Sequence, residues 1–130
     1  MPVLSPEHVE EIEAERSSLS VAEIARYLQE QLGQKMAAYV AGVNDARMVG
    51  RWSAGKHQPQ PDVDMRLRHA YQTVRLLVDA YSAETAKAWL FGSNSRLDDE
   101  APAYVLRHAK SWEDLGPVVP VARGFAGAAH

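Results

Sequence analysis

The spacing of apolar residues predicts a chain made almost entirely of helices. Apolar side chains recur three or four positions apart in residues 21–32 and again in residues 67–81, which is the period of an amphipathic helix. No segment alternates strictly between apolar and polar residues, so no strand is predicted, and there is no internal repeat. The pattern therefore predicts an all-α helical bundle.

Local start and stop signals divide this bundle into short helices. Ser20 and Glu23 have the spacing of a capping box, and Ser5 before Pro6 is a further start signal. Glycines end helices because they adopt left-handed conformations easily. Helix ends are predicted near Arg16 and at Gly33, Gly42, Gly55 and Gly92. Helix starts are predicted at Asn44 or Asp45, at Asp62 or Asp64, and at Ser82, Pro102 and Ser111. A polar loop is predicted over residues 93–102, and a last helix from about Pro120 to Phe125.

The longest predicted helix carries a wide apolar stripe, formed by Leu67, Ala70, Tyr71, Val74, Leu77, Val78 and Tyr81. Two uses of this stripe are open. It lies wholly in the core of one chain, or part of it is buried between two copies in a homodimer.

Composition and charge narrow the class of protein. The chain has 130 residues, which favours one domain, and it has no cysteine, no long apolar run and no signal segment, so we expect a cytoplasmic protein without membrane contact. The net charge is −3, but residues 33–75 carry seven basic and three acidic side chains, a local balance of +4. A local positive field of this kind permits phosphate binding in spite of an acidic average.

No catalytic or metal-binding pattern stands out. None of the histidines at positions 8, 57, 69, 108 and 130 has metal-ligand spacing or a neighbouring nucleophile motif, and there is no phosphate-binding glycine loop. The acidic run at residues 98–100 suggests either a cation site or, more simply, a solvated loop before a helix that begins with proline. We therefore expect no enzyme activity, no metal and no cofactor.

The basic middle of the chain has the parts of a helix-turn-helix. A small-residue helix ends at Gly42, and a second helix is predicted to bury Val49 and Trp52 while exposing Arg47, Arg51 and Ser53. In such units the N-terminal residues of the second helix enter the major groove, where asparagine can bind adenine and arginine can bind guanine. The DNA-binding candidates are Asn44, Asp45 and Arg47 near the bases, and Arg51, Lys56 and His57 near the phosphates.

Two segments carry a resemblance to a known family. "RWSAGKHQP" in residues 51–59 is similar to the end of Xre-type helix-turn-helix domains. Residues 88–126, "AWLFGSNSRLDDEAPAYVLRHAKSWEDLGPVVPVARGFA", resemble the toxin-binding domain of Xre/MbcA/ParS-like antitoxins. The positions that match are Trp89, Asn94, Leu97, Pro102 and Leu106.

The resemblance implies an antitoxin of a type II toxin–antitoxin system. Members of this family are all-helical, dimerise, bind operator DNA to repress their own operon, and cover the active site of a RES-domain toxin that consumes NAD. The resemblance divides the chain into three parts. These are an N-terminal extension (1–32), an Xre-like helix-turn-helix region with its long following helix (33–81) and a toxin-binding region (82–130). The toxin-binding candidates are Asn94, Arg96, Val118, Val121, Arg123, Gly124, Phe125 and Gly127.

Two other functions fit the same sequence. A stand-alone transcriptional regulator of phage or prophage type needs the helix-turn-helix but no toxin. An interaction protein whose helix-turn-helix has lost DNA binding would account for the acidic total charge. The N-terminal extension either mediates dimerisation or enlarges the core.

Overall fold

A computed structural model of the chain describes residues 4–127. The outer parts of the predicted terminal regions, residues 1–3 and 128–130, lie outside the described residues. Between residues 4 and 127 all regular structure is helical and there is no strand, as the apolar spacing predicts. The helices are α1 (Pro6–Ser18), α2 (Val21–Leu32), α3 (Gln34–Ala41), α4 (Arg47–Ser53), α5 (Pro61–Ala80), α6 (Ala83–Phe91), α7 (Pro102–His108), α8 (Trp112–Leu115) and α9 (Val118–Phe125), with a 3-10 turn at Ser95–Leu97.

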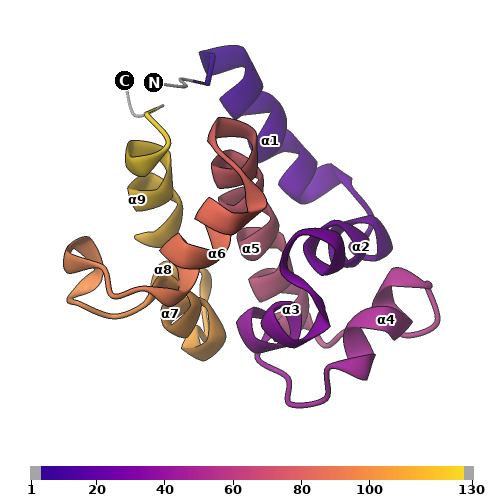
Figure 1. Cartoon of the computed structure of the whole chain (residues 1–130). Helices are drawn as coiled ribbons and strands as arrows, with labels where there is room; N and C mark the ends of the chain where they lie inside the picture. The colour runs from indigo at the N-terminus through magenta and orange to yellow at the C-terminus, as the bar shows by residue number, and fades with distance from the viewer. Residues whose placement is uncertain (1–3, 128–130) are drawn as a thin grey trace.

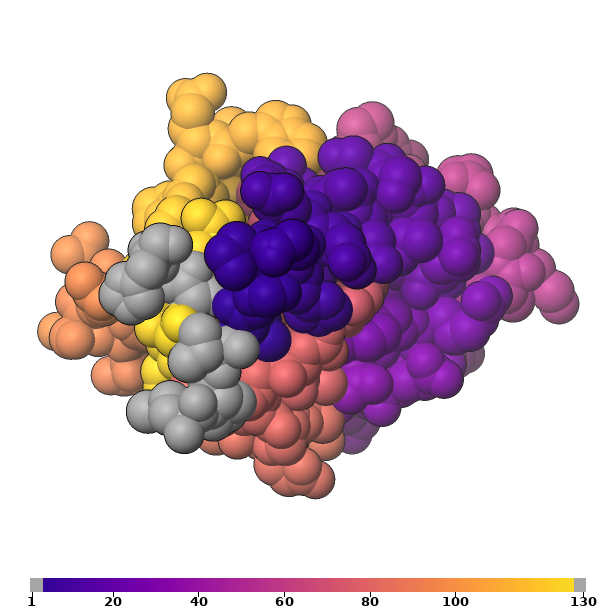
Figure 2. Space-filling model, turned by 90° about the horizontal axis from the view of Figure 1, so that it is seen from above, coloured from indigo at the N-terminus to yellow at the C-terminus, as the bar shows by residue number. Residues whose placement is uncertain are grey.

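The long helix α5 is the centre of the fold. It packs against α1, α2 and α3 and, on its other side, against α6, α7, α8 and α9. In Figure 1, α1 to α4 lie on one side of α5 and α7 to α9 on the other. Seen from above in Figure 2, α1 and α9 lie at the same end of the molecule. None of the helices within residues 4–127 has both the length and the apolar character that crossing a bilayer requires.

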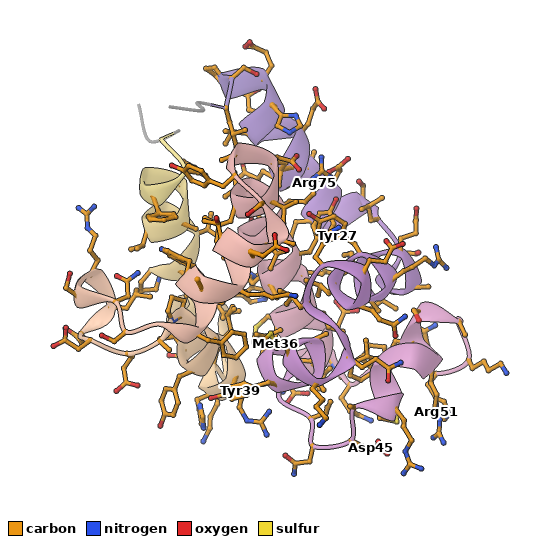
Figure 3. All side chains as sticks on the ribbon, in the orientation of Figure 1. Tyr27, Met36, Tyr39, Asp45, Arg51 and Arg75 are labelled. Atoms are coloured by element: carbon orange, nitrogen blue, oxygen red, sulfur yellow. The ribbon has the colours of Figure 1, made fainter. Side chains whose placement is uncertain are left out.

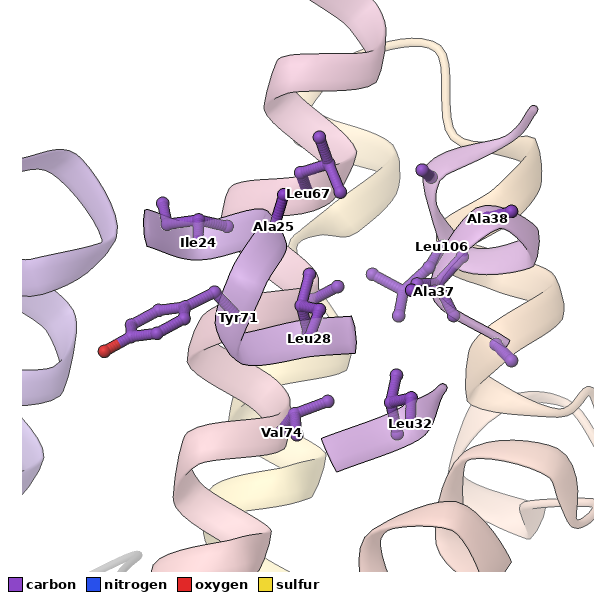
Figure 4. Packing of buried hydrophobic residues seen from close by; sticks show 14 of the residues in the cluster. Ile24, Ala25, Leu28, Leu32, Ala37, Ala38, Leu67, Tyr71, Val74 and Leu106 are labelled. Atoms are coloured by element: carbon purple, nitrogen blue, oxygen red, sulfur yellow. The ribbon is translucent and has the colours of Figure 1, made fainter. Parts of the chain in front are cut away.

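The main core lies where α2, α3, α5 and α7 meet (Figure 4). Leu28 of α2, Leu67 of α5 and Leu106 of α7 are fully buried there. Of the predicted stripe on α5, Leu67, Ala70, Tyr71, Val74 and Leu77 are buried, and Val78 and Tyr81 are partly buried. This burial takes place within one chain, so the stripe is used mainly in the core of the monomer. The homodimer stays a prediction that sedimentation of the isolated chain tests.

Most of the predicted helix ends are confirmed. Ser20 and Glu23 form the reciprocal capping box, and Ser5, Ser82 and Ser111 cap their helices with side-chain oxygens. Gly42 and Gly55 have φ angles of 84° and 74° where α3 and α4 end. Local side-chain chemistry is therefore sufficient to set these boundaries.

Several boundaries differ from the predictions. α1 runs to Ser18, and α5 begins at Pro61 because proline needs no hydrogen-bond acceptor in a first turn. The same reason lets α9 begin at Val118 with Pro120 inside its first turn. Residue 46, rather than Asn44 or Asp45, precedes α4 as its N-cap. The polar loop over residues 93–102 contains a 3-10 turn, and the loop also buries Leu97.

The helix α1 is fixed to α5 by a polar network and a small apolar cluster. Arg75 contacts Glu15 at 2.6 Å and Asp79 at 3.0 Å, and His8 contacts Asp79 at 2.7 Å. Figure 3 shows Arg75 and Tyr27 on neighbouring elements beside α1. The apolar cluster consists of Val9, Ile12, Leu76, Val119 and Ala122. Of the two roles open for the N-terminal extension, enlarging the core of this chain is therefore realised.

The α5 residue His69 makes folding stability depend on pH. It is 5% exposed and its ring lies 4.8 Å from that of Trp112. Burial, assisted by the positive charge of Arg16, lowers the pKa of His69 from 6.5 to about 4. Since an unfolded histidine keeps its ordinary pKa, the unfolded chain binds the proton first as the pH falls. The contribution of neutral His69 to the free energy of unfolding is therefore fully present above about pH 6.5 and is lost as the pH falls toward 4.

We expect His69 to lower the free energy of unfolding by about 2–3 kcal/mol when the pH falls from about 7 to about 4. Urea unfolding of the wild type and of His69→Phe at both pH values measures the effect. Phenylalanine keeps an aromatic ring against Trp112 and cannot be protonated. The variant should lose less stability on acidification than the wild type does. Equal losses in the two proteins would show that His69 is not held neutral in the fold.

Candidate functional site

The turn between α3 and α4 depends on a glycine. At the end of α3, the N–H of Gly42 donates to the carbonyls of Ala38 and Tyr39, and that of Val43 donates to Ala38. Gly42 has a φ of 84°, and a Cβ placed there would lie 2.7 Å from the Arg66 guanidinium. Both the conformation and the available space therefore require glycine, which fixes where the chain turns toward α4.

The inner face of α4 packs against α2, in the most extensive contact between any two of the described helices. Val49 and Trp52 are 0% and 2% exposed, so their predicted place in the core is confirmed. The predicted exposure of Ser53 is wrong. Its hydroxyl donates to the carbonyl of Gly50 at 3.0 Å, and its own carbonyl accepts from Arg26, which together turn it inward.

The outer face of α4 carries exposed basic side chains. The Arg47 side chain is 80% exposed, and Arg51, Lys56 and His57 are also exposed. Figure 3 shows Arg51 and Asp45 along one outer edge of the molecule. Asp45 accepts from the Arg47 guanidinium at 3.1 and 3.2 Å and from its backbone N–H at 3.0 Å. These hydrogen bonds from Arg47 lower the pKa of the Asp45 carboxyl group.

Asp45 thus contacts Arg47 before any ligand is bound. An ion pair this exposed contributes little to stability because water screens it, so a phosphate or a base edge can displace the carboxylate at small cost. Because its carboxylate is paired with Arg47, Asp45 is not placed as a residue that contacts bases would be. It orients the arginine and completes the turn before α4.

A groove lies between the α3–α4 turn and α7. Its volume is about 440 Å³, and it is lined by Lys35, Ala38, Tyr39, Val43, Asn44, Ala46 and Arg107. Asn44 is exposed, but its Oδ1 accepts a hydrogen bond of 2.7 Å from Arg107. Sequence reasoning missed Arg107 and Lys35 as neighbours of the turn. No local pattern could reveal Arg107, which is 63 positions away from Asn44.

A second groove lies between the loop after α6 and the helix α9. Its volume is about 380 Å³, and it is lined by Trp89, Ser93, Asn94, Ser95, Arg96, Val121, Gly124 and Phe125. Asn94 closes the 3-10 turn by accepting from the N–H of Arg96 at 3.0 Å. The structure thus brings together Asn94, Arg96, Val121, Gly124 and Phe125 of the toxin-binding candidates. Trp89 and the two serines were not among those candidates.

The three other toxin-binding candidates lie elsewhere. Val118 is 0% exposed in the main core, so its prediction as a surface residue is wrong. It faces inward because α9 begins there and packs against α5. Arg123 is partly buried, and its Nε is buried without a hydrogen-bond partner among the described residues. Gly127 follows α9 with a φ of 74°, as a helix-ending glycine does.

The acidic run after this groove is exposed. Asp98 and Asp99 adopt left-handed conformations with φ of 56° and 65°. Within residues 4–127 no three acidic or histidine side chains lie close enough together to hold a metal ion. Residues 98–100 form an exposed loop before the proline that begins α7.

Comparison of the chain with protein-family models, with curated proteins and with solved structures finds no match. Two surfaces of the described residues have chemistry suited to binding a partner. One is the basic outer face of α4 with the groove beside it. The other is the groove between the loop at residues 93–96 and α9.

Proposed function

We propose that the protein is the antitoxin of a type II toxin–antitoxin system. In this proposal α3 and α4 form a helix-turn-helix that binds operator DNA and represses the operon. The groove beside α9, named here the C-terminal groove, binds a RES-domain toxin and covers the site where that toxin consumes NAD. The observation that carries the proposal is the pair α3 and α4, joined at Gly42, with apolar residues inward and arginines outward.

The DNA-binding part is supported by the construction of α4. Val49 and Trp52 fix the helix against α2, so its opposite face is held rigidly toward solvent. On that face Arg47 lies at the N-terminal end, where a recognition helix contacts bases, and Arg51 lies one turn later. We assign Arg47 to a base edge and Arg51, Lys56 and His57 to phosphates, which position the protein without specifying the sequence.

The test is binding to a labelled DNA duplex from the region upstream of the gene, with a scrambled duplex as the comparison. The logarithm of the affinity should fall linearly as the logarithm of the salt concentration rises, because phosphate contacts release counterions. Arg47→Ala should cost about 1–3 kcal/mol on the upstream duplex and much less on the scrambled one. Arg51→Ala should weaken both duplexes alike and reduce the salt slope by about one unit.

An Arg47→Ala effect of the same size on both duplexes would reassign Arg47 to a phosphate. No binding by the wild type at low salt would favour the interaction protein without DNA binding. The observation that favours this alternative is the ion pair between Asp45 and Arg47.

The toxin-binding part is supported by the lining of the C-terminal groove. Trp89 and Phe125 supply aromatic surface, with ring centroids 6.2 Å apart. Arg96 and Asn94 supply polar groups from the opposing loop. A mostly apolar cleft with a few polar groups is the usual form of a specific binding site. Gly124 lines this groove, and a Cβ added there would lie 3.9 Å from Nη1 of Arg96, at ordinary contact distance.

Co-expression with a neighbouring RES-domain protein tests this part by copurification and by growth. Gly124→Leu should fill the groove and abolish both copurification and rescue of growth, since the helical backbone there accepts any side chain. Ala88→Leu adds the same side chain at an exposed position of α6 and should leave both unchanged. If DNA binding is intact but the wild type neither retains nor neutralises the toxin, a stand-alone regulator becomes the better interpretation.

A further inference from the structure

The α7 residue Arg107 makes four contacts with the last part of α3 and the turn that follows it. Its Nη1 donates to the carbonyls of Tyr39 at 2.9 Å and Val43 at 3.4 Å. Its Nη2 donates to Oδ1 of Asn44 at 2.7 Å, and its guanidinium carbon lies 4.7 Å from the centre of the Tyr39 ring. Arg107 therefore links α3 and the first part of the turn that follows it to a helix that lies outside the helix-turn-helix.

A second arginine fixes α7 relative to the same turn. Arg66 of α5 is buried and donates to the carbonyl of Ala41 at 2.8 Å and to that of Ala109 at 2.9 Å. These carbonyls lie at the C-terminal ends of α3 and α7, respectively. The position of Arg107 over the turn is therefore set by a buried contact that does not depend on any ligand.

The contact with Arg107 decides which way the Asn44 amide faces. A guanidinium has only donors, so the amide oxygen must lie toward Arg107 and the NH₂ group away from it. Asparagine recognises adenine by using its oxygen and its NH₂ together. With the oxygen held by Arg107, Asn44 presents donors to solvent and lacks the pair of groups that adenine requires.

The neighbouring residues favour an anion in the same groove. Lys35 and Arg107 are both basic, and none of the described residues that line the groove is acidic. Donors from an amide, an ammonium and a guanidinium suit the oxygens of a phosphate group. We propose that Asn44, oriented by Arg107, binds a backbone phosphate of DNA in the groove between α3 and α7 rather than an adenine base. This inference rests on the proposed DNA binding, and Arg107 acts in it as a positioning residue.

Binding of the upstream and scrambled duplexes tests the proposal. Asn44→Ala should weaken both duplexes equally, by about tenfold. Arg107→Lys keeps the charge but loses the forked hydrogen bonds, so we expect a similar loss with an unchanged salt slope. The matched control is Lys87→Gln, which removes one positive charge from α6, a helix that contributes no residue to the groove, and should leave both affinities unchanged.

A double-mutant cycle separates positioning from a general loss of structure. If Arg107 acts through Asn44, adding Asn44→Ala to Arg107→Lys should weaken binding no further. Additive losses would overturn the positioning role. A loss with Asn44→Ala that is confined to the upstream duplex would overturn the phosphate assignment and return Asn44 to base recognition. Absence of any binding by the wild type would refute the proposed DNA binding itself, and the phosphate site with it.

The orientation of the amide can be measured without DNA. In a nitrogen–proton correlation spectrum, the side-chain NH₂ signals of Asn44, assigned with Asn44→Ala, should move in Arg107→Lys and stay in place in Lys87→Gln. Unchanged Asn44 signals in Arg107→Lys would show that the two side chains are not in contact, and would contradict the inference whatever the DNA result.

Discussion

Replacing Arg66 with alanine is expected to lower the free energy of unfolding by about 3–5 kcal/mol. The residue is 7% exposed, and its guanidinium donates to the carbonyls of Ala41 and Ala109. A hydrogen bond from a charged donor contributes about 1.5–3 kcal/mol, and a buried carbonyl left without a partner adds a penalty. Urea unfolding measures the difference, and the variant should also lose part of the native helix packing around Gly42.

The control for this prediction is Asp62→Ala. Asp62 accepts from Arg66 at 3.2 Å, but its side chain is 57% exposed, so its loss should cost under about 1 kcal/mol. This comparison separates the two buried backbone contacts from the surface ion pair. Similar losses in the two variants would show that the ion pair, rather than the link between α3 and α7, is what Arg66 supplies to stability.

The element order could be predicted because its signals are local. Ser20 with Glu23 and the glycine at position 42 act on neighbours within one turn, so the sequence contains the whole interaction. The inward direction of Val49 and Trp52 follows in the same way from helical spacing. The error at Ser53 has in part the opposite cause, because Arg26 of another helix donates to the carbonyl of Ser53.

The candidate sites were predictable only in part for the same physical reason. The toxin-binding candidates in residues 94–96 and 121–125 follow from the family resemblance, and the fold brings these two segments to one groove. Arg107 contacts Asn44 only because α7 packs against α3, and no spacing of residues along the chain predicts that packing. Val118 was misplaced because the start of α9 depends on how that helix packs on α5.

Replacing Trp52 with alanine is the second change with a large expected effect. The indole is 2% exposed between α4 and α2, and removing a buried aromatic side chain costs about 3–5 kcal/mol through lost contacts and the cavity left behind. Because Trp52 fixes the helix that carries Arg47 and Arg51, the proposed DNA binding should weaken on all sequences together with stability. Thermal unfolding and duplex binding measured on the same preparation test both effects.

Trp52→Phe distinguishes packing from the polar group of the indole. The Nε1 of Trp52 is buried and has no hydrogen-bond partner among the described residues. An unsatisfied buried donor costs about 1–3 kcal/mol, so phenylalanine removes that penalty while it loses part of the ring contacts. The two changes oppose each other, and we expect Trp52→Phe to unfold within about 1 kcal/mol of the wild type. A loss as large as that of Trp52→Ala would mean that the indole N–H has a partner in solution, such as a buried water, and that this contact stabilises α4 on α2.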